Sequence, residues 1–361
     1  MEAVNNSPLF FVCLTANNRN EEMPLGMNHG MESEQSRNSA GMLLHLSKFR
    51  APLSSSLRKN DHKASPSVWV GWCVPADPGA CLINAVESRW DSYLKQLRAC
   101  KKEFSVDSVH HLRVATRRLI TQYFLIGCVA SGEKTPKMCK KLKSRLKILG
   151  EVRDAQIQRV FIDQQLARFP FLAPFHEVLR RRENRLVKDV ASDVDGFKNH
   201  KLNHWTRELC KQIHNWPQNA EKRDELTAEV LGALADAFTS VVRCRQSIDP
   251  ANSQTIHRTR VAFKKFRYMV EALSPDFTGL GKGQLRRFGD YQSRMGNLQD
   301  LEILEESVGH FLRENPDSQA KFAPFIRYLH QRRGKALRAC LDHADALFRF
   351  WDPVELARTA A

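Results

Sequence analysis

The chain has 361 residues, of which 42% are hydrophobic and 9% aromatic, a composition typical of a globular protein with a buried core. Lys and Arg total 56 against 40 Asp and Glu, and the resulting net charge of +16 predicts a polyanionic partner. The nine cysteines form no Cys-x-x-Cys pair, which argues for free thiols and against a disulfide framework or zinc site, and no apolar run reaches membrane-spanning length.

Residues 1–78 differ in composition from the rest of the chain. They are polar and non-periodic, and they hold seven basic and seven acidic residues, so the whole net charge falls on the remainder. We predict a mostly disordered N-terminal extension over 1–78, a structured body over 79–350 and a C-terminal tail over 351–361. The body is divided into a first half, 79–205, and a second half, 206–350.

From about residue 80 onward the apolar residues recur with a helical period, and β-branched alternation is rare. Gly and Pro occur mainly between the periodic segments. In chain order, the predicted helices cover 81–103, 108–130, 136–149, 154–168, 174–194, 201–215, 220–246, 253–273, 283–295, 300–314 and 323–349. The sequence therefore predicts an all-α protein.

Three sequence blocks occur twice in the same order. "VHHLRVATRRL" from Val109 matches "IHRTRVAFKKF" from Ile256 at a shift of 147 positions. "LGEVRD" then matches "MGNLQD" at a shift of 146, and "APFHEVLRRRENRLVK" matches "APFIRYLHQRRGKALR" at a shift of 150. This pattern predicts a tandem duplication, each half a bundle of about four main helices, with the halves packed about a pseudo-twofold axis.

The repeated blocks place basic residues on one stripe beside the core face of a helix. His110, Arg113 and Arg117 are spaced i, i+3, i+7, and His257, Arg260 and Lys264 repeat the stripe. Like charges at this spacing repel one another, and few acids are present to neutralise them, so a bound anion is a simple reason for their recurrence. The alternative is a solvated basic face with snorkelling stems.

Further basic residues extend these stripes. The helix over 136–149 carries a second i, i+3, i+7 set, and the last helix of each half carries a matched pair. Solvent exposure is an equally good interpretation of each of these residues taken alone. The candidates are Lys140, Lys143 and Lys147, with Arg286 at the Lys140 position of the second half, and Arg182 and Arg185, matched by Arg332 and Lys335.

His110 and His257 lack the neighbours that metal binding or catalysis requires, since neither lies near an HExxH motif or a pair of carboxylates. We expect each to donate a hydrogen bond to an anion or to act as a buried structural donor. No metal and no cofactor is therefore predicted.

The "LGEVRD" block and its repeat are interpreted as helix boundaries. We expect Gly150 to end one helix and Asp154 to cap the next, with Gly296 and Asp300 repeating the arrangement. Arg153, which is Gln299 in the second half, either reaches the anion or pairs with a carboxylate.

These blocks resemble the CHAD family, the conserved histidine α-helical domain, over about residues 85–345. The resemblance implies two antiparallel four-helix bundles and binding of inorganic polyphosphate along a basic cleft, with association with polyphosphate granules in the cytoplasm. On that analogy the ligand-facing residues are His110, Arg113, Arg117, Arg118, the Lys140–Lys147 stripe, His257, Arg260, Lys264, Lys265 and Arg267. The CYTH triphosphatase domain often fused to family members requires Glu-x-Glu-x-Lys, whereas "ESEQS" from Glu32 has Ser in the Lys position.

The predicted function is that of a polyphosphate-binding module with no catalytic constellation. Two alternatives remain open at this point. Non-specific nucleic-acid binding is disfavoured because most aromatics near the signatures fall on the core face, where they are not available to stack on bases. Phosphoanhydride hydrolysis is disfavoured because that chemistry normally needs carboxylates holding Mg²⁺ or an activated nucleophile.

Overall fold

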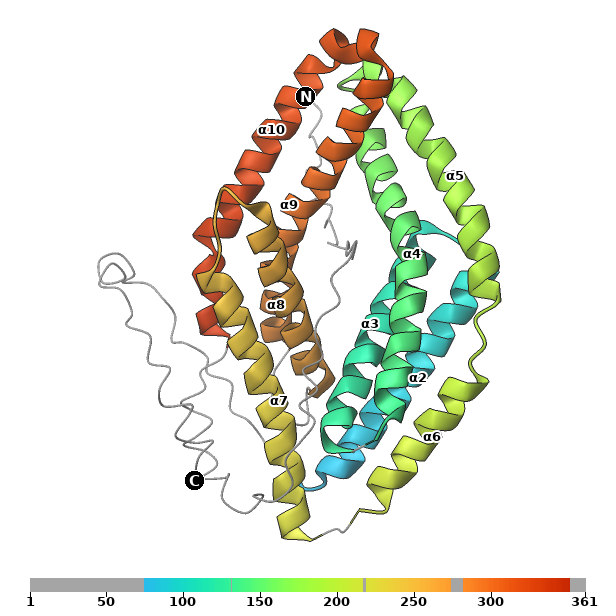
Figure 1. The fold of residues 1–361 in the computed structure, drawn as a ribbon, viewed down its shortest axis with the longest axis vertical. Coiled ribbons are helices and arrows are strands. Elements are labelled where there is room, and N and C mark those ends of the chain that lie inside the picture. The colour runs from blue at the N-terminus through green and yellow to red at the C-terminus, as the bar shows by residue number, and fades with distance from the viewer. Residues whose placement is uncertain (1–74, 131, 217–218, 274–281, 351–361) are drawn as a thin grey trace, which may run out of the picture.

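The computed structural model describes residues 75–130, 132–216, 219–273 and 282–350 (Figure 1). The described part of the chain is all-α and contains nine α-helices. The predicted extension over 1–78 lies almost entirely outside the described residues, as does the tail over 351–361. No helix of the described part combines the length and apolarity that crossing a bilayer requires.

The tandem duplication is confirmed, because corresponding blocks lie on corresponding helices of two bundles. In the first half the helices are α2 (Pro78–Lys102), α3 (Val106–Val129), α4 (Lys134–Gln165) and α5 (Ala173–Asp195). In the second half they are α7 (Ala220–Gln246), α8 (Ser253–Leu273), α9 (Lys282–Glu314) and α10 (Gln319–Asp342). Short 3-10 turns cover Pro170–Leu172 (η2), Pro316–Ser318 (η3) and Ala344–Arg349 (η4).

Polar side chains cap several helix starts. Asp77 accepts a hydrogen bond from the amide of Ala80 at the start of α2, and Asn219 accepts one from Lys222 at the start of α7. At the start of α3, Ser105 and Ser108 each accept a hydrogen bond from the other's amide in a capping box. These caps satisfy amides that the helix itself leaves without acceptors.

The predicted helix breaks at Gly150 and Gly296 are wrong. α4 runs for 32 residues and α9 for 33 residues, each straight through the glycine. A mid-helix glycine costs about 1 kcal/mol relative to alanine, but both glycines are buried in packed helices. The Arg113 guanidinium packs over Gly150, 3.6 Å from the place of a Cβ, so a larger residue at this position would crowd that side chain.

Two other predicted boundaries differ from the structure. The division at residues 205 and 206 falls inside α6 (His200–His214), which packs on α2, so packing places the junction between the halves after α6. The helix predicted over 323–349 begins earlier, at Gln319, and ends at Asp342, where η4 follows.

The two halves meet in two separate regions (Figure 1). At one end, Leu82 and Leu125 join the core formed by α7, α8 and α9. At the other end, the tips of α4 and α5 share an aromatic-rich core with α9 and α10, which includes Phe161, Phe311 and Phe325. Between these regions α3 packs against α8, and α4 contacts α9. The repeated basic signatures lie on these facing helices.

Candidate functional site

Three arginines from the two halves form the buried centre of the site. Arg113 and Arg117 lie on α3 and Arg260 lies on α8, with exposed fractions of 0%, 6% and 1%. Arginine is seldom buried to this extent unless it is paired. His110, Arg153 and Lys264 lie beside them. We call these six residues, His110, Arg113, Arg117, Arg153, Arg260 and Lys264, the central cationic cluster.

Several donors of the cluster lack acceptors within the described part of the chain. Nη1 of Arg113 donates to the Leu146 carbonyl at 2.9 Å, but Nε and Nη2 of Arg113 and both Nη atoms of Arg117 have no hydrogen-bond partner there. A buried donor without an acceptor costs about 1–3 kcal/mol, and more when it is charged. The arrangement is therefore one that an anion would stabilise.

Electrostatics in the cluster disfavour positive charge. Burial lowers the pKa of Arg113 from 12.5 to about 9, Arg117 lowers it further, and Asp154 opposes them. Half-buried Lys264 has a pKa well below its usual range because of burial and the nearby charges of Arg117, Arg260 and Arg113. The fold thus holds several cations close together, an arrangement typical of preorganised anion-binding sites.

The two signature histidines have different surroundings. Burial, followed by Arg153, lowers the pKa of His110 to about 3, so this ring is neutral at neutral pH. The Nδ1 atom of His257 is hydrogen-bonded to Oε1 of Gln299, which occupies the Arg153 position of the repeat. The first half therefore carries an additional cation beside its histidine. A neutral imidazole keeps one N–H that can donate a hydrogen bond, so donation from His110 to an anion stays a prediction.

Asp154 and Asp300 do not cap helices, which corrects the sequence prediction. Asp154 lies in the middle of α4, is 4% exposed, and neither of its oxygens has a hydrogen-bond partner among the described residues. Burial raises its pKa to about 6, Arg113 opposes this rise, and Asp300 adds to it. The two repeated acids therefore lie close together across α4 and α9, inside the cationic region.

Arg153 lies near both kinds of partner that the sequence left open. It is 8% exposed, and its Nη1 donates to the Val106 carbonyl at 3.3 Å. Burial lowers its pKa, while the charges of Asp300 and Asp107 oppose that effect. Arg153 thus lies within the cluster and is also close to carboxylates.

Arg118 and Arg267 lie apart from the cluster, in ion pairs with Glu271. Arg118 Nη2 is 3.3 Å from Glu271 Oε2, and Arg267 Nε donates to Glu271 Oε1 at 2.7 Å. Glu271 is nearly buried, and its carbonyl accepts a hydrogen bond from Arg89. The single carboxylate offsets one of the two positive charges, and the Arg118–Glu271 pair ties α3 to α8.

The lysines of α4 are exposed, and one of them approaches α8. The charge of Lys143 contributes to lowering the pKa of Lys265, after burial as the main cause. The Lys265 ammonium lies 4.2 Å from the centroid of the Phe124 ring. Lys140 and Lys147 share the exposed surface of α4. This surface adds positive charge outside the cluster.

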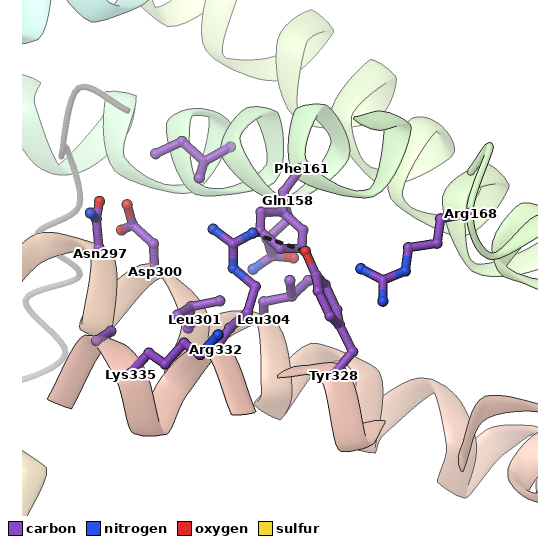
Figure 2. Close-up of a pocket in the computed structure, with 12 residues that line it drawn as sticks. Gln158, Phe161, Arg168, Asn297, Asp300, Leu301, Leu304, Tyr328, Arg332 and Lys335 are labelled. Carbon is purple, nitrogen blue, oxygen red and sulfur yellow. Dashed lines mark hydrogen bonds between the residues drawn. The ribbon is translucent and has the colours of Figure 1, made fainter. Parts of the chain in front are cut away.

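The remaining predicted residues occupy three different places. Arg182 and Arg185 are exposed on α5, and Arg182 is close enough to oppose the rise in the Asp154 pKa. Arg286 is exposed on α9. Arg332 and Lys335 on α10 line a separate pocket of about 500 Å³ between α4, α9 and α10 (Figure 2).

Sequence reasoning missed several residues of this region. Burial lowers the pKa of Arg117, and Tyr268 on α8, which is buried beside it, opposes that effect. Glu271 follows three residues later. The repetition of Asp154 and Asp300 was the available signal for paired acids, but capping offered a simpler explanation. Among the described residues, no group of three or more His, Cys, Asp or Glu is placed to hold a metal ion.

Comparisons with known proteins agree with this architecture. A family model described as CHAD domain matches residues 84–306. Among solved structures, the CHAD domain from the plant Ricinus communis aligns with a TM-score of 0.52 and 16% identity, covering 80% of this chain and 96% of that chain. PptA from Streptomyces chartreusis aligns with a TM-score of 0.52 and 14% identity, covering 75% and 99%. The search of curated proteins gave no match.

Proposed function

Because the chain belongs to the CHAD domain family, we propose that it binds inorganic polyphosphate through the central cationic cluster. The observation that carries this proposal is the burial of Arg113, Arg117 and Arg260 from both halves, together with donors of Arg113 and Arg117 that lack acceptors among the described residues. Polyphosphate carries a negative charge on nearly every unit, so one short stretch would satisfy several of these donors together. Arginine suits this task because its planar guanidinium pairs two donors with phosphate oxygens.

Partly exposed groups give the cluster a route to a ligand. His110, His257 and Lys264 are half-buried, whereas the three arginines are buried. The lysines of α4 and Lys265 extend the positive surface beyond the cluster. A long phosphate chain would contact both regions, with the arginines contributing the strongest hydrogen bonds and the exposed lysines mainly attracting the chain electrostatically.

The aromatic residues favour polyphosphate over single-stranded nucleic acid. Tyr123, Phe263 and Phe266 are each 0% exposed, so their faces are not available to bases. The half-buried Phe124 ring lies beneath the Lys265 ammonium. Non-specific binders of single strands rely on accessible aromatic faces for about 1–3 kcal/mol per base, and these four rings do not provide them.

The test compares the wild-type chain with Arg113→Met/Arg117→Met in equilibrium binding to long-chain polyphosphate. Methionine fills a similar volume without charge. The matched control, Arg207→Met/Lys211→Met, removes two exposed charges from α6. We expect the cluster variant to lose at least about tenfold in affinity, since each charged hydrogen bond contributes about 1.5–3 kcal/mol, and the control to stay within about twofold.

Two further measurements separate this function from the alternatives. Single-stranded DNA of equal total charge is used as a competitor, and stronger binding of the DNA than of polyphosphate would replace the proposal with nucleic-acid binding. Phosphate release is followed with Mg²⁺ present, because Asp154 and Asp300 lie together and not at helix caps. Release that stops in Asp154→Asn would establish a hydrolase instead of a binding module.

We further propose that polyphosphate binding brings the protein to cytoplasmic polyphosphate granules. A fluorescent fusion of the full chain is expected to colocalise with stained granules, and the Arg113→Met/Arg117→Met fusion is expected to remain diffuse. Colocalisation of both fusions would show that another surface is responsible.

A further inference from the structure

We propose that the pocket between α4, α9 and α10 is a second ligand site, which binds a free purine nucleoside phosphate. This site adjoins the central cationic cluster but is lined by different residues, and its chemistry does not depend on polyphosphate binding. Its volume of about 500 Å³ lies within the usual range for small-molecule sites. The pocket combines an apolar interior with cations, a combination that a phosphate chain alone would not require.

The walls of the pocket are largely apolar. Phe161 comes from α4, Leu301 and Leu304 from α9, and Ala336 from α10. Such walls gain free energy by covering a ring and gain nothing from a phosphate chain, which keeps its water. The apolar surface therefore favours a ligand with a planar organic part.

Two guanidiniums lie on opposite sides of Tyr328 (Figure 2). The guanidinium carbon of Arg332 is 5.6 Å from the Tyr328 ring centroid and 5.7 Å from that of Phe161, and Arg332 Nη1 donates to the Tyr328 hydroxyl at 2.9 Å. Arg168 lies 4.8 Å from the same tyrosine centroid. Guanidinium planes stack on bases and also bind phosphate.

Positive charge in the pocket is available to a ligand. Arg168, Arg332 and Lys335 line the pocket, and the ion pairs of the described residues include none of them. Asp300 lines the pocket as well, but it also lies near Arg153 and Asp154. The Lys335 and Asp300 end therefore adjoins the central cationic cluster, and we place the phosphates of the nucleotide at this end.

A buried amide favours a base over other ring systems. Gln158 is 4% exposed and lines the pocket, and its Oε1 has no hydrogen-bond partner among the described residues. Asn297 lies beside Asp300, towards the end where we place the phosphates (Figure 2). Amide side chains pair with the donor and acceptor edge of a purine, especially adenine. The exocyclic amine of the purine would supply the donor that Gln158 lacks.

The test is calorimetric titration of the full chain with ATP, with inorganic triphosphate as the probe that has the phosphates but no ring. We expect one saturable ATP site, with an affinity at least about tenfold higher than that for triphosphate, because burial and stacking of the base add to the phosphate contacts. Arg332→Glu/Lys335→Glu should weaken ATP binding at least about tenfold. Its matched control, Arg327→Glu/Arg338→Glu, reverses exposed charges of the same helix outside the pocket and should stay within about twofold.

Gln158→Leu provides the second variant, since leucine fills the buried position without a polar group and should leave the thermal unfolding temperature unchanged or higher. We expect it to weaken ATP binding about fivefold or more. Equal binding of ATP and triphosphate, both lost in Arg113→Met/Arg117→Met, would overturn the proposal, because the ring would then contribute nothing. Absence of a saturable ATP site would overturn it as well. In a competition experiment, displacement of ATP by a single-stranded oligonucleotide but not by AMP would instead assign the pocket to nucleic acid.

Discussion

Replacing Arg113 with methionine should stabilise the fold and weaken polyphosphate binding. The side chain is fully buried in the cluster, and its pKa falls from 12.5 to about 9, mainly through burial. At about 1.36 kcal/mol per pKa unit, keeping this charge in the folded protein costs on the order of 5 kcal/mol. A lowered pKa in a cation means that the folded state disfavours the charge, so the full cost applies at neutral pH, well below 9.

Part of this cost is offset by favourable contacts that the substitution also removes. Arg113 donates one hydrogen bond to the Leu146 carbonyl, which is worth about 1 kcal/mol, and it lowers the pKa of Asp154. Replacing buried charges by apolar groups of similar volume is often stabilising by about 1–4 kcal/mol. We therefore expect Arg113→Met to raise the free energy of unfolding by about 1–4 kcal/mol in the absence of polyphosphate.

The assay is urea unfolding at pH 7, repeated with saturating polyphosphate. Because a ligand stabilises a protein more the tighter it binds, with a logarithmic dependence on affinity, polyphosphate should raise the wild-type unfolding free energy more than that of Arg113→Met. The control, exposed Arg207→Met on α6, should change stability by no more than about 0.5 kcal/mol. A loss of more than about 1 kcal/mol in Arg113→Met would refute the reasoning, since the guanidinium would then be a satisfied structural group.

Three other predictions concern neighbouring groups. The pKa of Asp154 is raised to about 6 from 3.8, so its carboxylate destabilises the fold increasingly as pH rises from about 4 through 6. Polyphosphate affinity, measured in titrations from pH 7 to pH 5, should therefore rise as Asp154 is protonated. The Asp154→Asn variant should flatten this rise. The lowered pKa of Lys264 predicts that an amine-reactive acylating agent modifies it faster than exposed Lys140 at pH 7.5, with protection by polyphosphate; equal rates in mass spectrometry would contradict this. Glu271→Gln leaves Arg118 on α3 without its ionic partner on α8. The free energy of unfolding, measured by urea unfolding, should therefore fall by about 1–3 kcal/mol. An unchanged value would show that the pair does not hold the halves together.

The sequence predicted the features that recur with a helical period. Val109, Leu112, Leu119 and Tyr123 recur with this period in the sequence, and all are buried on α3. The same periodicity placed Arg113 on a common stripe with other cations. The duplication could be predicted because each pattern occurs twice in the chain, and the second occurrence makes a chance match improbable.

Helical periodicity in the sequence does not predict contacts between distant segments. Gly150 and Asp154 suggested a helix end locally, but α4 continues through both residues and buries them in the tertiary structure. Arg118 carried the expected charge on the expected helix, yet its partner Glu271 lies 153 positions away and is reached only after α3 and α8 pack. Pairings of this kind depend on tertiary structure, which the periodicity of one helix does not contain.

The most direct test of the central claim is the salt dependence of polyphosphate affinity. Plots of log affinity against log salt concentration should be steep for the wild-type chain, since each neutralised phosphate contributes a slope of about 0.7–0.9. Arg113→Met/Arg117→Met should bind more weakly and with a slope shallower by about 1.4–1.8, because two phosphate contacts are removed. Coincident lines for the wild type and this variant would show that polyphosphate is held by other cations.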